Sequence, residues 1–251
     1  MQDRDTALSN QRALLDGVAT TYRRNSAQDD VMRKLCVRTF APWLRQHQSA
    51  LEVGCSDGKM TEMLAAHVRE IDVVEATAFF LAEARKRNVP NATFHHAMIE
   101  QFEPDKKYDR IFATWILTHM VDAASALVHL RGLLAPGGLL LVTVPNVRVL
   151  SRQLALHMGL LSDLYGLSDN DRAHGHVRAY DRQRLNLEIR QAGFEPVEQG
   201  GLMLKILADY QMDALFDSKL LGDQHVEGFY RLGREYPDLC SAIYSVCRIA
   251  E

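Results

Sequence analysis

The spacing of hydrophobic positions changes at about residue 48. Before that point Met32, Cys36, Phe40 and Trp43 recur at the three- and four-residue intervals of a helix with one apolar face. After it, apolar residues gather into short runs bounded by turn-forming residues, as buried strands do. The pattern predicts a helical N-terminal extension, or cap, over residues 1–48 and a strand-containing domain over residues 49–251.

Seven apolar runs have the length and residue types of strands, and most are separated by helix-like segments. The clearest helical stripe, Ala123, Leu127, Leu130 and Leu134, ends at an Ala-Pro-Gly-Gly turn. Such alternation predicts an α/β fold, in which a largely parallel sheet carries helices on both faces. The predicted strands are ALEV (50–53), IDVVEA (71–76), ATFHHA (92–97), DRIFATW (109–115), LLLVTVPN (139–146), FEPVEQG (194–200) and CSAIYSVCRIA (240–250).

The C-terminal third adds two insertions, at about 147–180 and 202–238. Residues 147–167 place apolar side chains on one helical face, and a polar loop, SDNDRAHGHVRAYD, follows them. Ligands of α/β sheets bind outside the carboxyl ends of the strands, so these helical insertions are candidate lids. The apolar residues of the first insertion are Leu150, Leu154, Met158, Leu161 and Tyr165.

Composition narrows the possible partners. A formal net charge of −3 and 24% charged residues give no general attraction to nucleic acid or to an anionic membrane. No apolar run has the roughly 18 residues of a membrane span, and the first residues lack a signal-peptide core. The four cysteines form no CxxC pair, so we expect reduced, packed thiols rather than disulfides or zinc ligands. We expect a cytoplasmic protein, and the sequence allows either a monomer or a homo-oligomer.

The turn EVGCSDGKMTEML, residues 52–64, allows three interpretations. Gly54-Cys55-Ser56-Asp57-Gly58 matches the G-x-S-x-G elbow of hydrolases, but only helical sequence precedes it, so nothing upstream can supply an oxyanion loop. The dinucleotide pattern G-x-G-x-x-G fails because the second and third glycines are out of register. Glu52 would repel a pyrophosphate, whereas it suits a ligand that carries an ammonium group.

A second acid supports the third interpretation. Glu75 ends the second predicted strand, where a carboxylate can accept hydrogen bonds from both hydroxyls of a ribose. Glu52, the glycine turn and Glu75 together describe a nucleoside with a cationic amino-acid part and no phosphate. S-adenosylmethionine has these properties.

Four segments, in order, resemble the motifs of class I S-adenosylmethionine-dependent methyltransferases, in the small-molecule branch of types 11 and 12. They cover roughly residues 48–200 and are LEVGCSDGKMTEML, VVEAT, YDRIFATWILTHM and LRGLLAPGGLLLVTVPN. The resemblance implies a Rossmann-like, seven-stranded, mostly parallel sheet with an antiparallel last strand. It also implies S-adenosyl-L-methionine as the cofactor.

By this resemblance, the first turn surrounds the methionine part, Glu75 holds the ribose, and residues 96–99 lie beside the adenine. Many relatives have an aspartate in that last stretch, but this chain offers Ala97 and Met98, so adenine would rely on backbone groups and apolar contact. The expected cofactor-binding residues are Glu52, Gly54, Cys55, Ser56, Gly58, Glu75, Ala76, Ala97, Met98, Ile99, Thr114 and Trp115.

The acceptor side has less of a signature, because methyl transfer from a sulfonium chiefly needs alignment, exclusion of water and, for a hydroxyl, a base. Trp115 and His119 follow the fourth strand, where the family borders the transferred methyl group. Trp115 could form one side of the site while His119 extends into it. Alternatively, His119 could be a residue at a helix N-terminus that only packs against the protein. Tyr22, in TTYRRN, could close over the cofactor or belong to a charged helix face.

The segment AHGHVRAYD holds the other candidates. If it is extended, His174 and His176 share one face that Arg178 continues, which suits a base with an anion clamp, and Tyr180 follows. A solvated loop is the alternative. We predict no metal site, since two histidines at this spacing lack a third ligand.

These observations predict an S-adenosylmethionine-dependent methyltransferase that acts on a small metabolite, for example in natural-product or sugar biosynthesis. Arg178 suggests an acceptor that carries negative charge. An oxygen acceptor is favoured because histidines gather where a base would serve. A small-amine N-methyltransferase and a non-catalytic S-adenosylmethionine-binding partner or regulator are the alternatives. The predicted catalytic residues are His174, His176 and His119, and the predicted substrate-binding residues are Tyr22, Trp115, His119, Arg178 and Tyr180.

Overall fold

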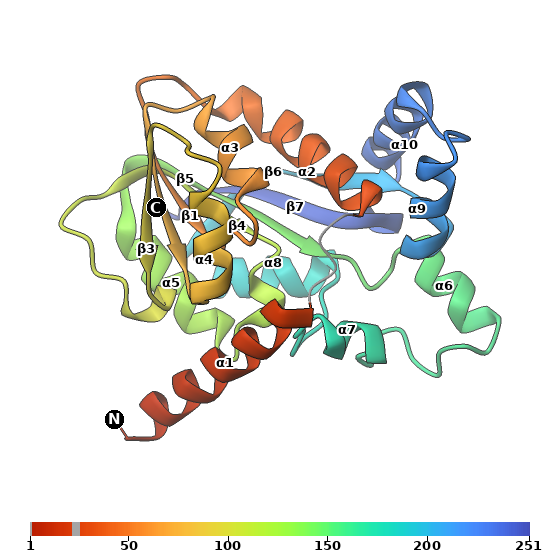
Figure 1. The fold of residues 1–251 in the computed structure, drawn as a ribbon, viewed down its shortest axis with the longest axis horizontal. Coiled ribbons are helices and arrows are strands. Elements are labelled where there is room, and N and C mark those ends of the chain that lie inside the picture. The colour runs from red at the N-terminus through yellow and green to blue at the C-terminus, as the bar shows by residue number, and fades with distance from the viewer. Residues whose placement is uncertain (1, 22–25) are drawn as a thin grey trace.

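The computed structural model describes residues 2–21 and 26–251 and is built around one seven-stranded sheet (Figure 1). The strand order is β3-β2-β1-β4-β5-β7-β6; β1 to β5 pair in parallel, and β7 runs antiparallel to both β5 and β6. This topology confirms the predicted fold class. The strands are β1 (Ser49–Val53), β2 (Glu70–Glu75), β3 (Ala92–His96), β4 (Tyr108–Thr114), β5 (Leu134–Pro145), β6 (Phe194–Leu204) and β7 (Cys240–Ile249).

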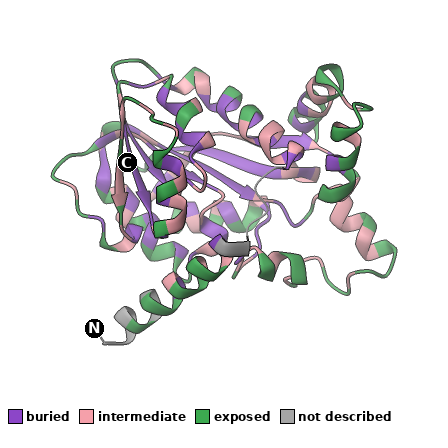
Figure 2. Ribbon diagram, in the orientation of Figure 1, coloured by how far each residue is buried: buried purple, intermediate pink, exposed green. Residues whose placement is uncertain are grey.

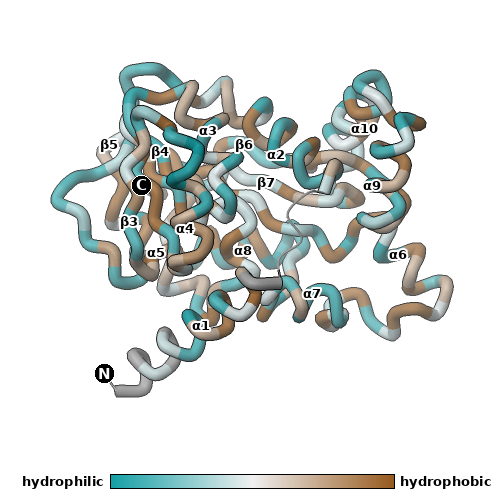
Figure 3. Tube along the Cα trace, viewed as in Figure 1, coloured by the Kyte–Doolittle hydropathy of each residue, from teal (hydrophilic) through white to brown (hydrophobic). Residues whose placement is uncertain are grey.

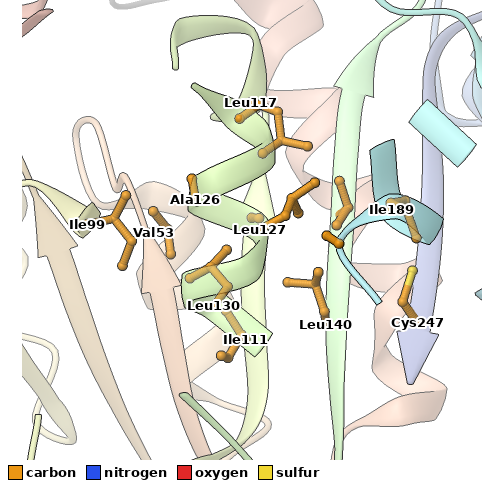
Figure 4. Close-up of a cluster of buried hydrophobic side chains, with 14 of the residues drawn as sticks. Val53, Ile99, Ile111, Leu117, Ala126, Leu127, Leu130, Leu140, Ile189 and Cys247 are labelled. Carbon is orange, nitrogen blue, oxygen red and sulfur yellow. The ribbon is translucent and has the colours of Figure 1, made fainter. Parts of the chain in front are cut away.

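Helices cover both faces of the sheet, and each face has its own hydrophobic core. Against one face pack α2 (Ala27–Phe40), α3 (Lys59–Ala65), α4 (Ala78–Arg85) and α10 (Asp223–Glu235), and against the other pack α5 (Ala123–Leu133) and α8 (Arg182–Gln191). Figure 4 shows Leu127 and Leu130 of α5 directed at the sheet beside Ile111 and Leu140. The strands β1, β2, β4, β5 and β7 are accordingly mostly buried, whereas β3 at the end of the sheet has no buried residue (Figure 2).

The remaining helices are α1 (Gln2–Thr21), α6 (Leu150–His157), α7 (Asp169–Ala173) and α9 (Asp209–Asp217), with short 3-10 turns η1 (Ala41–Trp43), η2 (Ile99–Gln101), η3 (Leu117–His119) and η4 (Pro237–Leu239). The helices expected before the first strand are thus present as α1 and α2. No described helix is both long enough and apolar enough to cross a bilayer. The four cysteines are buried and free, as expected.

Two expectations for the first insertion are corrected. Residues 147–167 do not form one amphipathic helix, because α6 ends at His157 and the chain continues without regular structure. No residue from 148 to 174 is buried, although several of them are apolar, as Figure 3 shows for the segment after α6. The predicted polar loop instead contains α7, which begins with a capping box between Ser168 and Asp171.

Candidate functional site

The chain leaves β1 through a turn that needs its glycines. Gly54 and Gly58 have φ of +74° and +75°, and a Cβ on Gly54 would lie 2.9 Å from Cδ1 of Ile116. A Cβ on Gly58 would lie 2.9 Å from the backbone of Ala84 in α4. Ser56 also has a positive φ, +48°, which an L-residue adopts only at a cost. The turn is therefore a strained, tightly enclosed cradle at the carboxyl end of β1.

Glu52 lies under this cradle with half of its carboxylate unsatisfied. Its side chain is fully buried; Oε2 accepts a hydrogen bond from Oγ1 of Thr61 at 2.5 Å, and Oε1 has no partner among the described residues. Burial raises the pKa of Glu52 to about 8; the bond from Thr61 offsets part of this rise, and the charge of Glu75 adds to it. A buried oxygen without a partner indicates a ligand that donates to it.

Glu75 lies at the end of β2, where it was expected, and it holds the turn from that side. Oε2 accepts from the backbone nitrogen of Cys55 at 3.0 Å and of Ser56 at 3.4 Å, while Oε1 accepts from Thr77, from its nitrogen at 2.9 Å and its hydroxyl at 3.0 Å. The carboxylate is nearly buried. These hydrogen bonds fix the conformation of the cradle; the contact of Glu75 with a ribose stays a prediction.

The stretch predicted for adenine is next to Glu75. The nitrogen of Ala97 donates to the carbonyl of Glu75 at 3.1 Å, and Met98 and Ile99 are buried where η2 begins. The carbonyl of Ala76 lies 3.1 Å from Nε2 of His96. Backbone atoms and apolar side chains are thus what this edge of β2 and β3 offers a base.

The end of β4 turns away from the sheet at a strained residue. Thr114 is buried, and Trp115 has φ of +56°, an unusual conformation for a bulky side chain, held by a bond from its nitrogen to the carbonyl of Thr143 at 2.7 Å. The next residue, Ile116, is the one that crowds Gly54. Strained backbone at the ends of two neighbouring strands is typical of a functional site.

Three histidines meet just beyond this edge. Nδ1 of His119 lies 3.2 Å from the carbonyl of Gly175, so this nitrogen carries the proton and Nε2 keeps its lone pair. The rings of His119 and His176 have centroids 5.0 Å apart, and those of His174 and His176 6.3 Å apart. Burial, together with the neighbouring His176, lowers the pKa of His119 to about 4, which keeps His119 neutral.

His174 and His176 come together in a different way from the one expected. His174 is the C-cap of α7, with Nδ1 2.7 Å from the carbonyl of Asn170, and Gly175 follows with φ of +76°. The two histidines therefore flank a tight turn and do not share the face of an extended strand, so that part of the prediction is wrong. Gly175 is required there because a Cβ would lie 2.8 Å from Val18 of α1.

Arg178 and Tyr180 have partners within the protein. Nη1 of Arg178 lies 3.8 Å from Oε1 of Glu188, Nη2 donates to the carbonyl of Val121, and Nε has no partner among the described residues. The buried Tyr180 donates its hydroxyl proton to Oε2 of Glu188 at 2.6 Å. Both residues line a small cavity of about 20 Å³, into which His176 also faces.

Tyr22 lies outside the described residues. Within the described part of the chain, no three histidine, cysteine, aspartate or glutamate side chains are grouped to hold a metal ion.

Several contacts of the site were not anticipated from the sequence. Thr61 binds Glu52, and its place one turn into α3 was a usable signal, since a hydroxyl there faces back toward β1. Gln11 of α1 donates to the carbonyl of His119 at 3.1 Å, and Asp171 lies beside His176. Neither long-range contact has a local sequence signal, because each joins segments that only the fold brings together.

Comparison with known proteins identifies the family. The sequence profile of the methyltransferase domain family matches residues 21–199. The chain belongs to the class I S-adenosylmethionine-dependent methyltransferases.

Individual proteins match this chain either over a short aligned segment or in fold alone. A trans-aconitate 2-methyltransferase from Methylobacterium radiotolerans is 33% identical over 98 residues, 39% of this chain and 38% of that protein. The aligned segment thus spans about four tenths of that relative. The N-methyltransferase NodS from Bradyrhizobium japonicum, solved with S-adenosyl-L-homocysteine, has a TM-score of 0.59 at 16% identity, over 90% of each chain. The [4+2]-cyclase SpnF gives 0.60 at 19% identity, over 90% of this chain and 84% of that one.

The residues of this chain fit the family's cofactor. The unpaired Oε1 of Glu52 suits the ammonium of the methionine part, and the cradle from Gly54 to Gly58 leaves no room for larger side chains. Met98 and Ile99 are buried apolar side chains, of the kind that an adenine ring would contact. When bound, S-adenosylmethionine supplies an activated methyl group.

Proposed function

We propose that this protein methylates an oxygen atom of a small metabolite, with S-adenosylmethionine as the methyl donor. The observation that carries the proposal is the meeting of His119, His174 and His176 at η3, which follows the carboxyl end of β4 next to β1 and its cradle. An acceptor hydroxyl must lose a proton as its oxygen is methylated, and imidazole is the side chain suited to take it near neutral pH.

Within the cluster we assign Nε2 of His176 as the base that takes the hydroxyl proton of the acceptor. His119 is a weaker base, because its burial lowers the pKa to about 4, and it serves as a neutral wall that His176 packs against. His174 is tied to the carbonyl of Asn170 at the end of α7, so we place it at the rim.

The acceptor's charge is part of the proposal. Arg178 keeps one N–H group, at Nε, free of partners among the described residues, beside the cavity that His176 lines. That group supports an acceptor with a carboxylate or similar anion, although Glu188 already neutralises part of the guanidinium charge. By its name, the relative from Methylobacterium radiotolerans methylates trans-aconitate, a carboxylate.

We also propose that residues 1–48 act as a helical cap on a methyltransferase domain formed by residues 49–251. The support is that α1 reaches the acceptor side, where Gln11 bonds to the carbonyl of His119 and Val18 adjoins Gly175.

The test is transfer of a labelled methyl group from S-adenosylmethionine to a panel of small hydroxyl, carboxyl and amine acceptors. We expect labelled product from an oxygen acceptor, and a His176→Gln variant with turnover reduced at least tenfold and unchanged binding of S-adenosyl-L-homocysteine. His47→Gln is the matched control, since His47 is exposed in the turn before β1, at the opposite end of that strand from the cradle.

Two outcomes favour the alternatives. A neutral amine needs only positioning, so labelled product from amines alone, unaffected by His176→Gln, would indicate an N-methyltransferase. NodS, a structural neighbour, is an N-methyltransferase. Cofactor binding without transfer to any acceptor would favour a non-catalytic partner.

A further inference from the structure

Asp171 is the one carboxylate among the described residues that lies against the imidazole of His176. Its Oδ1 is 3.5 Å from Nδ1 of His176. Its Oδ2 accepts three hydrogen bonds, from the nitrogen of Ser168 at 2.8 Å, its hydroxyl at 2.7 Å, and Nη1 of Arg152 at 2.9 Å. The carboxylate is thus anchored by one oxygen and presents the other to the ring.

The anchoring is more than a helix cap requires. A capping box needs only the reciprocal bonds between Ser168 and Asp171, both of which are present. Arg152 comes from α6, and it also bonds the carbonyl of Leu164 at 2.7 Å. The guanidinium therefore joins α6, the following segment and α7, and it holds the carboxylate in place against His176.

The charges around His176 determine what this carboxylate does. Asp171 and His174 lie on α7, His119 on η3, Arg152 on α6 and Arg178 on the segment of His176 itself. The contacts from α1, Gln11 and Val18, carry no charge. Burial alone would raise the pKa of Asp171, but the bonds from His176, Ser168 and Arg152 outweigh it and hold this pKa well below its usual range.

A fixed carboxylate at Nδ1 has two effects on an imidazole. It keeps the single proton of the neutral ring on Nδ1, so that the lone pair is on Nε2, and it stabilises the imidazolium that forms when Nε2 takes a second proton. His176 and Asp171 both line the small cavity beside Arg178, which has room for about one water molecule.

We propose that Asp171 is a positioning residue that fixes the ring of His176 and sets its tautomer, with the lone pair on Nε2, for the methyl transfer proposed above, on which this inference rests. The acceptor oxygen forms its bond to the methyl carbon while the carbon–sulfur bond breaks and its electron pair stays on sulfur. The hydroxyl proton passes to Nε2 of His176 and from there to solvent. Asp171 stays ionised throughout and touches no reacting atom.

The experiment observes His176 directly, by nitrogen-15 NMR of the histidine rings in the ligand-free protein. The wild type is expected to show the Nδ1–H tautomer, and Asp171→Asn to increase the share of the Nε2–H tautomer, because a neutral amide is a weaker acceptor than a carboxylate. Asp169→Asn, the same change on an exposed residue of α7, is the control and leaves the tautomer unchanged.

Kinetics then separate positioning from capping. Asp171→Asn is expected to lower kcat at least tenfold and to leave KM for S-adenosylmethionine within twofold. Ser168→Ala removes the cap and one of the three bonds to Oδ2 but keeps the carboxylate beside Nδ1, so it keeps the wild-type tautomer and loses less kcat than Asp171→Asn. An Nε2–H tautomer in the wild type, or an unchanged tautomer in Asp171→Asn, overturns the inference, whether or not methyl transfer occurs. Should Asp171→Asn not fold, the wild-type tautomer still decides.

Discussion

The two carboxylate oxygens of Glu52 differ in their hydrogen bonding. One is satisfied by Thr61, and the other lies buried without a partner, so the ligand-free protein disfavours the charged form. This accounts for the pKa of about 8, since burial penalises an anion that no cation balances. A ligand that places an ammonium beside Oε1 lowers the pKa of Glu52 and so favours the ionised carboxylate. Binding and ionisation at this residue are therefore coupled.

The first prediction follows from that coupling. Below pH 8, Glu52 must lose a proton before it can bind an ammonium, so affinity for S-adenosyl-L-homocysteine is expected to rise with pH between 6 and 8 and then level. Calorimetric titrations in buffers of different ionisation enthalpy measure the released proton. In Glu52→Gln the release is lost and affinity falls about tenfold or more. Glu62→Gln, on the exposed side of α3, is the control; equal proton release in Glu52→Gln would contradict the coupling.

The same residue makes ligand-free stability depend on pH. The folded pKa of Glu52, about 8, is above its unfolded value, so its contribution is fully present below about pH 4.5 and is lost as pH rises toward 8. Denaturant unfolding at several pH values is expected to give a free energy that falls more steeply for the wild type than for Glu52→Gln over this window. Parallel curves would show that Glu52 is not a buried acid with a raised pKa.

At the scale of elements, the helix α2 is fixed at its start by one serine. Ser26 caps α2 by accepting from the nitrogen of Asp29 at 3.1 Å, and it donates to Oδ1 of the buried Asp213 of α9 at 2.8 Å. Asp213 also accepts from the nitrogen of Gln28 at 3.0 Å. The junction thus ties the N-terminal helices to the second insertion.

We predict that Ser26→Ala lowers the free energy of unfolding by about 1–2 kcal/mol, because it removes an N-cap and a buried hydrogen bond together. Urea denaturation monitored by circular dichroism measures the loss. Ser125→Ala, on an exposed position of α5, is the control and should stay within about 0.5 kcal/mol of the wild type. Equal values for the two variants would mean that the junction contributes nothing measurable.

The elements also show what the sequence could predict. The strands were predictable because a parallel sheet covered on both faces requires continuous apolar runs, and these stand out between turn residues. The cradle was predictable because its glycines and Glu52 are local in sequence. The end of α6 was missed because its apolar side chains suggested a longer helix, yet none of them finds a core to pack against. The start of α7 had a signal, Ser168 followed by Asp171 three residues later, that the polar composition obscured.

The acceptor side was harder to predict, and for a physical reason. His119, His176 and Asp171 are separated by up to 57 positions, and they meet only because α1, η3 and α7 converge at one edge of the sheet. Residue types indicated a base, but the turn at Gly175, the bond from Gln11 and the carboxylate beside His176 depend on tertiary contacts. Sequence patterns report periodicity and local turns; they do not report which loops meet.

At the scale of the whole molecule, the parallel sheet brings the cradle, Glu52 and Glu75 to the carboxyl ends of its strands. The cradle follows β1, Glu75 ends β2, and β4, which pairs with β1, leads through Trp115 to η3 and His119; Figure 1 shows these strands side by side. We predict that S-adenosyl-L-homocysteine at 100 times its Kd stabilises the folded protein by about 2.7 kcal/mol, measured as a rise in Tm. Gly58→Val, whose side chain would collide with Ala84, should fold less stably and show a smaller rise.

The central claim is that this edge of the sheet binds a phosphate-free, cationic nucleoside. Its most direct test is calorimetric titration of the folded protein with S-adenosylmethionine, S-adenosyl-L-homocysteine and NAD in parallel. The account predicts one site per chain for each of the first two ligands and no binding of NAD. Binding of NAD, with no heat from either sulfur nucleoside, would contradict it.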